Sequence, residues 1–180
     1  FSSDAGKTAT TSFWGMVVAK PTETLSLTAG VRHDDHRDFG SATTLAFDAG
    51  QKIGDLVTVR ASYREGFKAP TLFQLSGTAG AFGNPDLLPE QAKSYEIGLR
   101  FGDTHRWFLD FAAFRRDSRN LIDFVSCPPG AALPAICATG TRPFGTYDNI
   151  NRARGEGFEV EGGAKLGAAF ELSANYSLIS

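Results

Sequence analysis

The chain has 180 residues, of which 42% are hydrophobic and 21% charged, and its formal net charge at pH 7 is -2 with a pI near 5.9. This composition is ordinary for a folded protein and excludes long disorder and a collagen-like repeat. Acidic and basic residues are interspersed, so no basic surface for a phosphate backbone is expected. Nucleic acid is therefore not predicted as a partner.

A membrane-spanning helix is not predicted, because the longest apolar run is far shorter than the roughly 20 residues such a helix needs. A transmembrane strand needs only about 9 to 11 residues and alternates in polarity, so the membrane question depends on periodicity. The chain has no starting Met and no signal-peptide pattern, and it stops within an apparent strand, ANYSLIS. We therefore expect a segment of a longer protein.

Apolar and polar residues alternate with period two along most of the chain, which indicates strands with one apolar and one polar face. In residues 56–64, for example, Val57 and Tyr63 fall on one face and Arg60 and Arg64 on the other. The first predicted strand alternates least. Eight strands are predicted, at about residues 11–20, 24–36, 42–50, 55–66, 91–102, 106–125, 143–166 and 168–180.

The connections between these strands alternate in length. Residues 67–90 and 126–142 are long, with 37–41 on the same side by parity, whereas the others are tight: 20–24, 50–55, 102–105 and 166–168. This alternation predicts an all-β, antiparallel, up-and-down transmembrane barrel of the outer-membrane type. A soluble β-sandwich is the alternative, but its strands average about 5 to 6 residues. Since an open sheet has two unpaired edges, further strands are expected outside the segment.

Charged residues gather on the polar faces of the predicted strands, where a small packed barrel would not hydrate them. A wide, wet interior would, and we predict Arg60, Arg64, Glu96 and Arg100 as lumen residues; the other interpretation is the solvated face of a soluble sheet. Aromatics near the strand ends, such as Trp107 and Tyr63, fit interfacial girdles. The polar-face set is Arg32, Arg60, Arg64, Glu96, Arg100, Asp110, Glu159, Glu161, Lys165 and Glu171.

Residues 60–100 contain several fixed elements in order: SYREGFKAPTLFQL, a Gly-rich loop, GNPDLLPE and a returning YEIGLR. This order resembles TonB-dependent receptors, most closely the cobalamin receptors and then the siderophore receptors, and residues 30–44, 115–124 and 149–166 extend the similarity. The resemblance implies eight strands of a barrel of about 22 that encloses a plug domain. Residues 1–180 would then be part of that barrel domain, without the plug or the terminal strands.

The resemblance further implies a receptor in the bacterial outer membrane, surrounded by its lipid, that binds cobalamin or a ferric siderophore at extracellular loops. It would import this small ligand with energy from the TonB complex, contacted through the plug domain. No cofactor is implied. Two other functions remain open, a passive outer-membrane pore and a soluble β-rich binding module.

The motif at residues 67–90 has a physical interpretation of its own. Pro70 fixes its own φ and biases the preceding residue to extended geometry, so strand pairing ends there and residues 71–76 form one helical turn before Gly77. Asn84-Pro85-Asp86 is a turn sequence. The loop is either architectural, folding back over the rim, or in direct contact with ligand. Candidates for ligand contact are Phe67, Phe73, Gln74, Phe82 and Asn84.

Three further features carry weaker predictions. Cys127 and Cys137 flank a short loop that a disulfide closes in an oxidising compartment, the alternative being two free thiols. Two His and three Asp in residues 33–38 are types that ligate metals, but alternation divides them between two faces, so solvated charges are favoured over a metal site. Glu159 and Glu161 face a wet lumen without a cleft, and no catalytic motif is present, so no enzyme is predicted.

Overall fold

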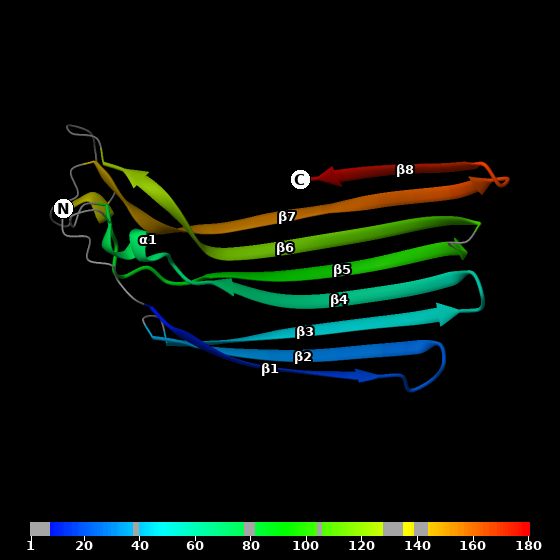
Figure 1. Ribbon diagram of the computed structural model, residues 1–180. Helices are drawn as coiled ribbons and strands as arrows, with labels where there is room; N and C mark the ends of the chain where they lie inside the picture. The colour runs from blue at the N-terminus through cyan, green and yellow to red at the C-terminus, as the bar shows by residue number, and fades with distance from the viewer. Residues whose placement is uncertain (1–7, 38–39, 78–81, 104–105, 128–134, 139–143) are drawn as a thin grey trace.

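The computed structural model describes residues 8–37, 40–77, 82–103, 106–127, 135–138 and 144–180. These residues form one antiparallel sheet of eight strands in which every strand pairs with its neighbours in the chain (Figure 1). The elements are β1 (Thr10–Ala19), β2 (Leu25–His36), β3 (Gly40–Ile53), β4 (Val57–Lys68), α1 (Leu72–Ser76), β5 (Glu90–Asp103), β6 (Trp107–Ser126), the 3-10 turn η1 (Ala135–Ala138), β7 (Gly145–Leu166) and β8 (Phe170–Ile179).

The eight predicted strands and their order are confirmed. The largest difference is in β3, which runs from Gly40 to Ile53 rather than over residues 42–50. Its polar end stays in the sheet because Lys52 and Ile53 pair with the first residues of β4, and the chain reverses only at Gly54, whose φ of 61° suits glycine. The position of the turn therefore determines where β3 ends, and the polarity of its last residues does not.

The cross-strand register separates the strands into two faces. Residues paired in an antiparallel sheet project from the same face, and the row through Asp48, Ser62 and Glu96 defines the face that we call polar. The neighbouring row through Tyr63 and Tyr95 defines the apolar face. Large hydrophobic side chains on the apolar face, including Phe47, Ile97 and Phe158, are exposed because the described residues form a single layer. A sandwich would need a second sheet against this face.

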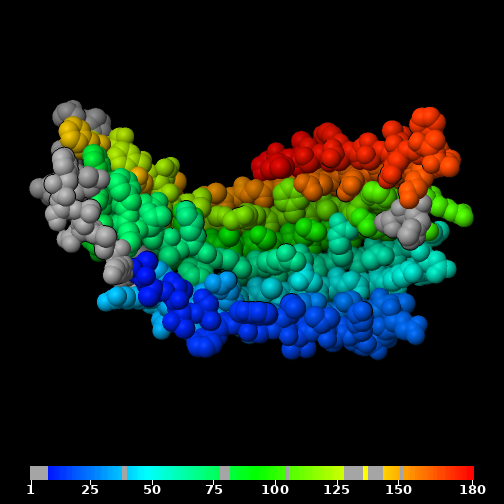
Figure 2. Space-filling view, in the orientation of Figure 1, coloured from blue at the N-terminus to red at the C-terminus, as the bar shows by residue number. Residues whose placement is uncertain are grey.

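The two ends of the sheet differ as the loop lengths predicted. The tight connections lie together at the right end in Figure 1, and the connections that carry α1 and η1 lie at the left end. In the space-filling view the strands run side by side in chain order, from blue β1 to red β8 (Figure 2). Buried side chains gather at this long-loop end and include Leu87, Cys127, Cys137 and Thr146. No described helix has the length and hydropathy to cross a membrane.

Candidate functional site

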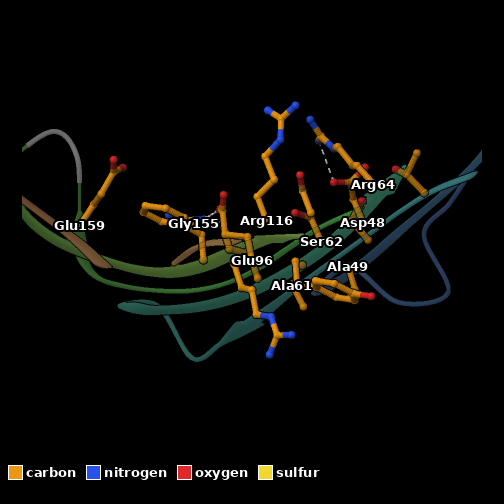
Figure 3. Close-up of a pocket in the computed structure, with 17 residues that line it drawn as sticks. Asp48, Ala49, Ala61, Ser62, Arg64, Glu96, Arg116, Gly155 and Glu159 are labelled. Atoms are coloured by element: carbon orange, nitrogen blue, oxygen red, sulfur yellow. Dashed lines mark hydrogen bonds and ion pairs between the residues drawn. The ribbon is translucent and has the colours of Figure 1, made fainter. Parts of the chain in front are cut away.

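A broad groove of about 950 Å³ lies on the polar face, on the inside of the sheet's curve (Figure 3). Three of the predicted lumen residues, Arg60, Arg64 and Glu96, line this groove. The fourth, Arg100, lines a second recess of about 460 Å³ that also includes Arg60. The structure therefore brings all four onto one face, as alternation predicted.

Asp110 on β6 is the centre of an ion-pair network between these grooves. Its carboxylate accepts hydrogen bonds from the Arg60 guanidinium at 2.9 and 2.6 Å and from Arg100 Nε at 2.6 Å. Its side chain is only 8% exposed, whereas those of Arg60 and Arg100 are 37% and 38% exposed. Glu96 lies 3.5 Å from Arg60 Nε and completes the cluster. Two cations thus hold one nearly buried anion.

Gly98 on β5 makes this network possible. Arg60 faces Gly98 across the β4–β5 pair, and a Cβ at that position would lie 2.5 Å from the Arg60 guanidinium carbon. Since glycine has no side chain, the Arg60 side chain crosses β5 and reaches Asp110 on the next strand. Sequence reasoning placed Asp110 on the polar face, but gave no sign of its partners.

Other charges on the polar face are more accessible. Arg64 donates to Asp48 at 2.8 Å, and the two side chains are 64% and 37% exposed (Figure 3). Arg116 and Glu159 project into the same groove, and within the described part of the chain neither has an ion-pair partner. These groups are available to a polar molecule in the groove. Arg116 and Asp48 were not predicted as site residues, although alternation places both on this face.

The long-loop end holds the remaining predicted residues, and α1 begins there as expected. Thr71 caps the helix: its hydroxyl accepts from Gln74 N, and the Gln74 side chain accepts from Thr71 N, a capping box. Gly77 ends the helix with a φ of 62°. The Gln74 amide is therefore used in the cap, and the predicted single helical turn before Gly77 is confirmed.

Two asparagines fasten the loop after α1 to β7. Asn84 is 4% exposed, its Nδ2 donates to Tyr147 O at 2.9 Å, and its Oδ1 accepts from Asp86 N at 3.1 Å. Asn149, which the sequence did not single out, accepts from Leu88 N at 2.7 Å and donates to Leu88 O at 2.9 Å. These bonds occupy the Asn84 side chain and fit the architectural interpretation of the loop.

Aromatic side chains surround this fastened loop and form a continuous series that we call the rim aromatic cluster. Phe73 meets Tyr147 edge to face at 6.0 Å between ring centroids, and Phe82 lies 6.0 Å from Phe124 and 6.3 Å from Phe144. Phe124 and Tyr147 complete the series at 5.4 Å. Phe73 and Phe144 are 51% and 69% exposed, so the cluster presents ring surface to solvent.

The cysteines and the remaining predicted residues lie around the same end. Cys127 and Cys137 form a disulfide with an S–S distance of 1.98 Å, which confirms the bridged alternative. Phe67 is in the β4 row of the apolar face, opposite Gln91, and so lies away from the groove. Asp34 is nearly buried and accepts from Arg32 and Ser12, and Asp38 falls outside the described residues.

Comparison with known proteins gives consistent matches over this chain. A family model described as "TonB dependent receptor-like, beta-barrel" matches residues 1–180. The vitamin B12 transporter BtuB of Vibrio vulnificus is 35% identical over 135 residues, covering 74% of this chain and 19% of the relative. The iron-regulated outer membrane virulence protein of Vibrio cholerae is 30% identical over 166 residues, covering 86% of this chain and 25% of the relative.

Solved structures match the fold over nearly the whole chain. The siderophore receptor PirA from Pseudomonas aeruginosa superposes with a TM-score of 0.79 and 26% identity, covering 96% of this chain and 35% of the receptor. The chain thus spans between about a fifth and a third of the proteins that it resembles.

Proposed function

This chain belongs to the TonB-dependent receptor β-barrel family, and from that premise we propose that the protein binds a scarce small ligand, cobalamin or a ferric siderophore, and imports it across the bacterial outer membrane with energy from TonB. The observation that carries the proposal is the polar face with its two grooves. In this family the polar face lines the barrel lumen and the apolar face meets lipid. The chain is a transport component and not an enzyme.

The charge arrangement of the polar face supports a hydrated path for a ligand. Asp110, Arg60 and Arg100 neutralise one another, so this part of the wall is fixed. Arg64 and Arg116 lie nearer the long-loop end, and Glu159 lies in the same row as Arg60. These exposed charges offer both signs to a passing molecule. A wall of balanced charge hydrates a polar solute without holding it tightly.

Ligand arrival is assigned to the rim aromatic cluster. Its exposed rings, Phe73 above all, offer flat apolar surface at the end where the long loops gather. Phe82 is proposed to support Phe73 indirectly, through Phe124 and Tyr147. Gln74 and Asn84 are proposed to shape the loop from within, since their side chains bond to the chain itself. Coupling to TonB is proposed to pass through a plug domain, as in the family.

The test is uptake by cells that lack their own receptors and express the full-length protein, with TonB present or deleted. Labelled cyanocobalamin and a panel of ferric siderophores are offered separately. We expect saturable uptake of one ligand that disappears without TonB. Ion conductance of the purified protein in planar bilayers, together with unsaturable uptake in both strains, would instead establish a passive pore.

A variant pair tests the ligand surface in the same cells. Phe73→Ala removes an exposed ring and should weaken ligand binding about fivefold, since one aromatic contact contributes roughly 1 kcal/mol. Phe170→Ala is the control, because it removes a ring that is even more exposed, at the opposite end of the sheet. Equal effects of the two changes, or none from Phe73→Ala, would remove the rim aromatic cluster from the proposal.

A further inference from the structure

The apolar face changes character at one end of β5, β6 and β7. Beyond Tyr95, toward the long loops, the side chains on this face become charged rather than apolar. Successive cross-strand rows are Ile97–Ala113–Phe158, then Tyr95–Arg115–Glu156, then Lys93–Asp117–Arg154, then Gln91–Arg119–Arg152. The change occurs within two rows.

These charged rows enclose a groove of about 440 Å³, which we call the outward groove. Five cationic side chains and one carboxylate line it: Lys93, Arg115, Arg119, Arg152, Arg154 and Asp117. Two more carboxylates border it. Glu65 contacts Tyr63 and Lys93, and Glu156 lies opposite Arg115 across the β6–β7 pair. The cations therefore remain in excess when the bordering residues are counted.

The distribution of partners leaves part of this charge uncompensated. Asp117 accepts from Arg115 Nε and from Arg154 Nε, each at 2.8 Å. Arg119 donates to the neutral Gln91 side chain. Arg152 lies directly opposite Arg119, and in the ranges the structure describes neither has a carboxylate partner. Like charges directly opposed across strands are destabilising, so this pair calls for an external anion.

The height of the outward groove fits the headgroup layer. Tyrosines mark the membrane interface in such barrels, and Tyr95 lies in the same row as Arg115. The Arg119–Arg152 row is four residues further along β5 from Tyr95, or about 13 Å along the strand and roughly 10 Å in height after tilt. The polar headgroups extend about 5 to 8 Å beyond the hydrocarbon core. The Arg119–Arg152 row therefore lies just above the outer edge of this layer, within reach of long arginine side chains that extend back toward the headgroups.

The groove is local and not a general property of this rim. Toward the same end of β2 and β3, the apolar face carries the facing pair His33 and Thr43, which hydrogen-bond to each other at 2.9 Å. Basic residues are therefore concentrated on β5, β6 and β7. A local concentration is typical of a binding site, whereas evenly spread charge would serve solvation.

We propose that the outward groove binds the phosphate groups of a phosphorylated lipid in the outer leaflet of the membrane. Guanidinium groups form paired hydrogen bonds to phosphate oxygens, and Arg119 and Arg152 supply two such groups side by side. The lipid is a neighbour of the barrel and not its cargo. The proposal rests on the membrane orientation of the family and is independent of the ligand that is imported.

The experiment measures lipid retention by the full-length protein in detergent micelles, using native mass spectrometry. The probes are a phosphorylated glycolipid, its dephosphorylated form, and inorganic phosphate as competitor. The variant Arg119→Gln with Arg152→Gln should bind the phosphorylated lipid roughly tenfold more weakly, because two charge-assisted contacts are lost. Arg119→Lys with Arg152→Lys keeps the charge without the paired geometry and should lose less.

The control is Arg64→Gln with Arg116→Gln, which removes the same charge from the polar face of β4 and β6. It should leave lipid retention unchanged. The proposal is overturned if the two glutamine pairs lose lipid equally, if neither does, or if the dephosphorylated lipid binds as well. Displacement of the lipid by inorganic phosphate at similar concentration would assign the groove to a free anion instead. Thermal melting of each variant confirms that it is folded before lipid is added.

Discussion

Replacing Asp110 with alanine tests whether the polar face is held together by its ion-pair network. The change removes three charge-assisted hydrogen bonds, from Arg60 at 2.9 and 2.6 Å and from Arg100 at 2.6 Å. A single bond to a charged group contributes about 1.5 to 3 kcal/mol, and breaking a fully buried pair costs about 3 to 5 kcal/mol. These figures bound the expected loss.

The solvent exposure of the two arginines lowers the expected loss of stability. Arg60 and Arg100 are 37% and 38% exposed, so water replaces part of what they lose, and the Arg100 guanidinium still lies 5.1 Å from the centre of the Phe108 ring. We expect Asp110→Ala to lower the free energy of unfolding by about 2 to 3 kcal/mol. Asp48→Ala is the matched control: it breaks one exposed pair and should cost less than about 1 kcal/mol.

The assay is urea unfolding of the full-length protein in lipid vesicles, followed by tryptophan fluorescence. Asp110→Asn should fall between the two alanine variants, since its amide keeps a neutral acceptor for one guanidinium. Equal destabilisation by Asp110→Ala and Asp48→Ala would refute the reasoning, because burial of the carboxylate would then have no measurable effect.

Three other predictions concern the long-loop end. Gly83→Ala should loosen the loop after α1 and raise its cleavage rate by added protease, because its Cβ would lie 2.4 Å from the main chain at the end of α1; Gly66→Ala, with no atom within 4 Å, should not. Asn149→Ala should raise hydrogen exchange in the same loop by removing both of its bonds to Leu88, and unchanged exchange would contradict this. Reducing the Cys127–Cys137 disulfide, which joins residues ten positions apart, should lower local stability by about 3 kcal/mol. The measurement is the rate of proteolysis between the cysteines, which should be faster in the reduced protein. Equal rates in the reduced and oxidised protein would disprove this prediction.

The sequence was most informative where period two ties a residue to one face. Strands β4 and β5 alternate cleanly, so the shared face of Arg60, Arg64, Glu96 and Arg100 was predictable from each strand alone. Strand β1 alternates poorly. Its register puts Trp14 opposite Arg32, on the polar face, where an apolar residue was not expected.

Partners across strands were not predictable, because they depend on register between segments far apart in the chain. Arg60 and Asp110 are fifty positions apart, and their contact needs Gly98 on the strand between them. The rim aromatic cluster likewise joins Phe73 and Phe82 to Phe124 on β6, Tyr147 on β7 and Phe144 just before β7. The only sequence signal was the aromatic content beside Cys127, which does not identify contacts.

A single-layered sheet has little core of its own, so both its stability and its function depend on the molecules that surround it. The exposed side chains Phe47, Ile97 and Phe158 gain burial from lipid, not from a second layer. On the polar face, Arg60, Arg64 and Arg100 have carboxylate partners within the sheet, whereas Arg119 and Arg152 face each other at the headgroup level. The charges on the polar face that remain unpaired, Arg116 and Glu159, are of opposite sign, whereas those of the outward groove are both positive. The outward groove is therefore the part of the sheet to which we assign an anion from outside.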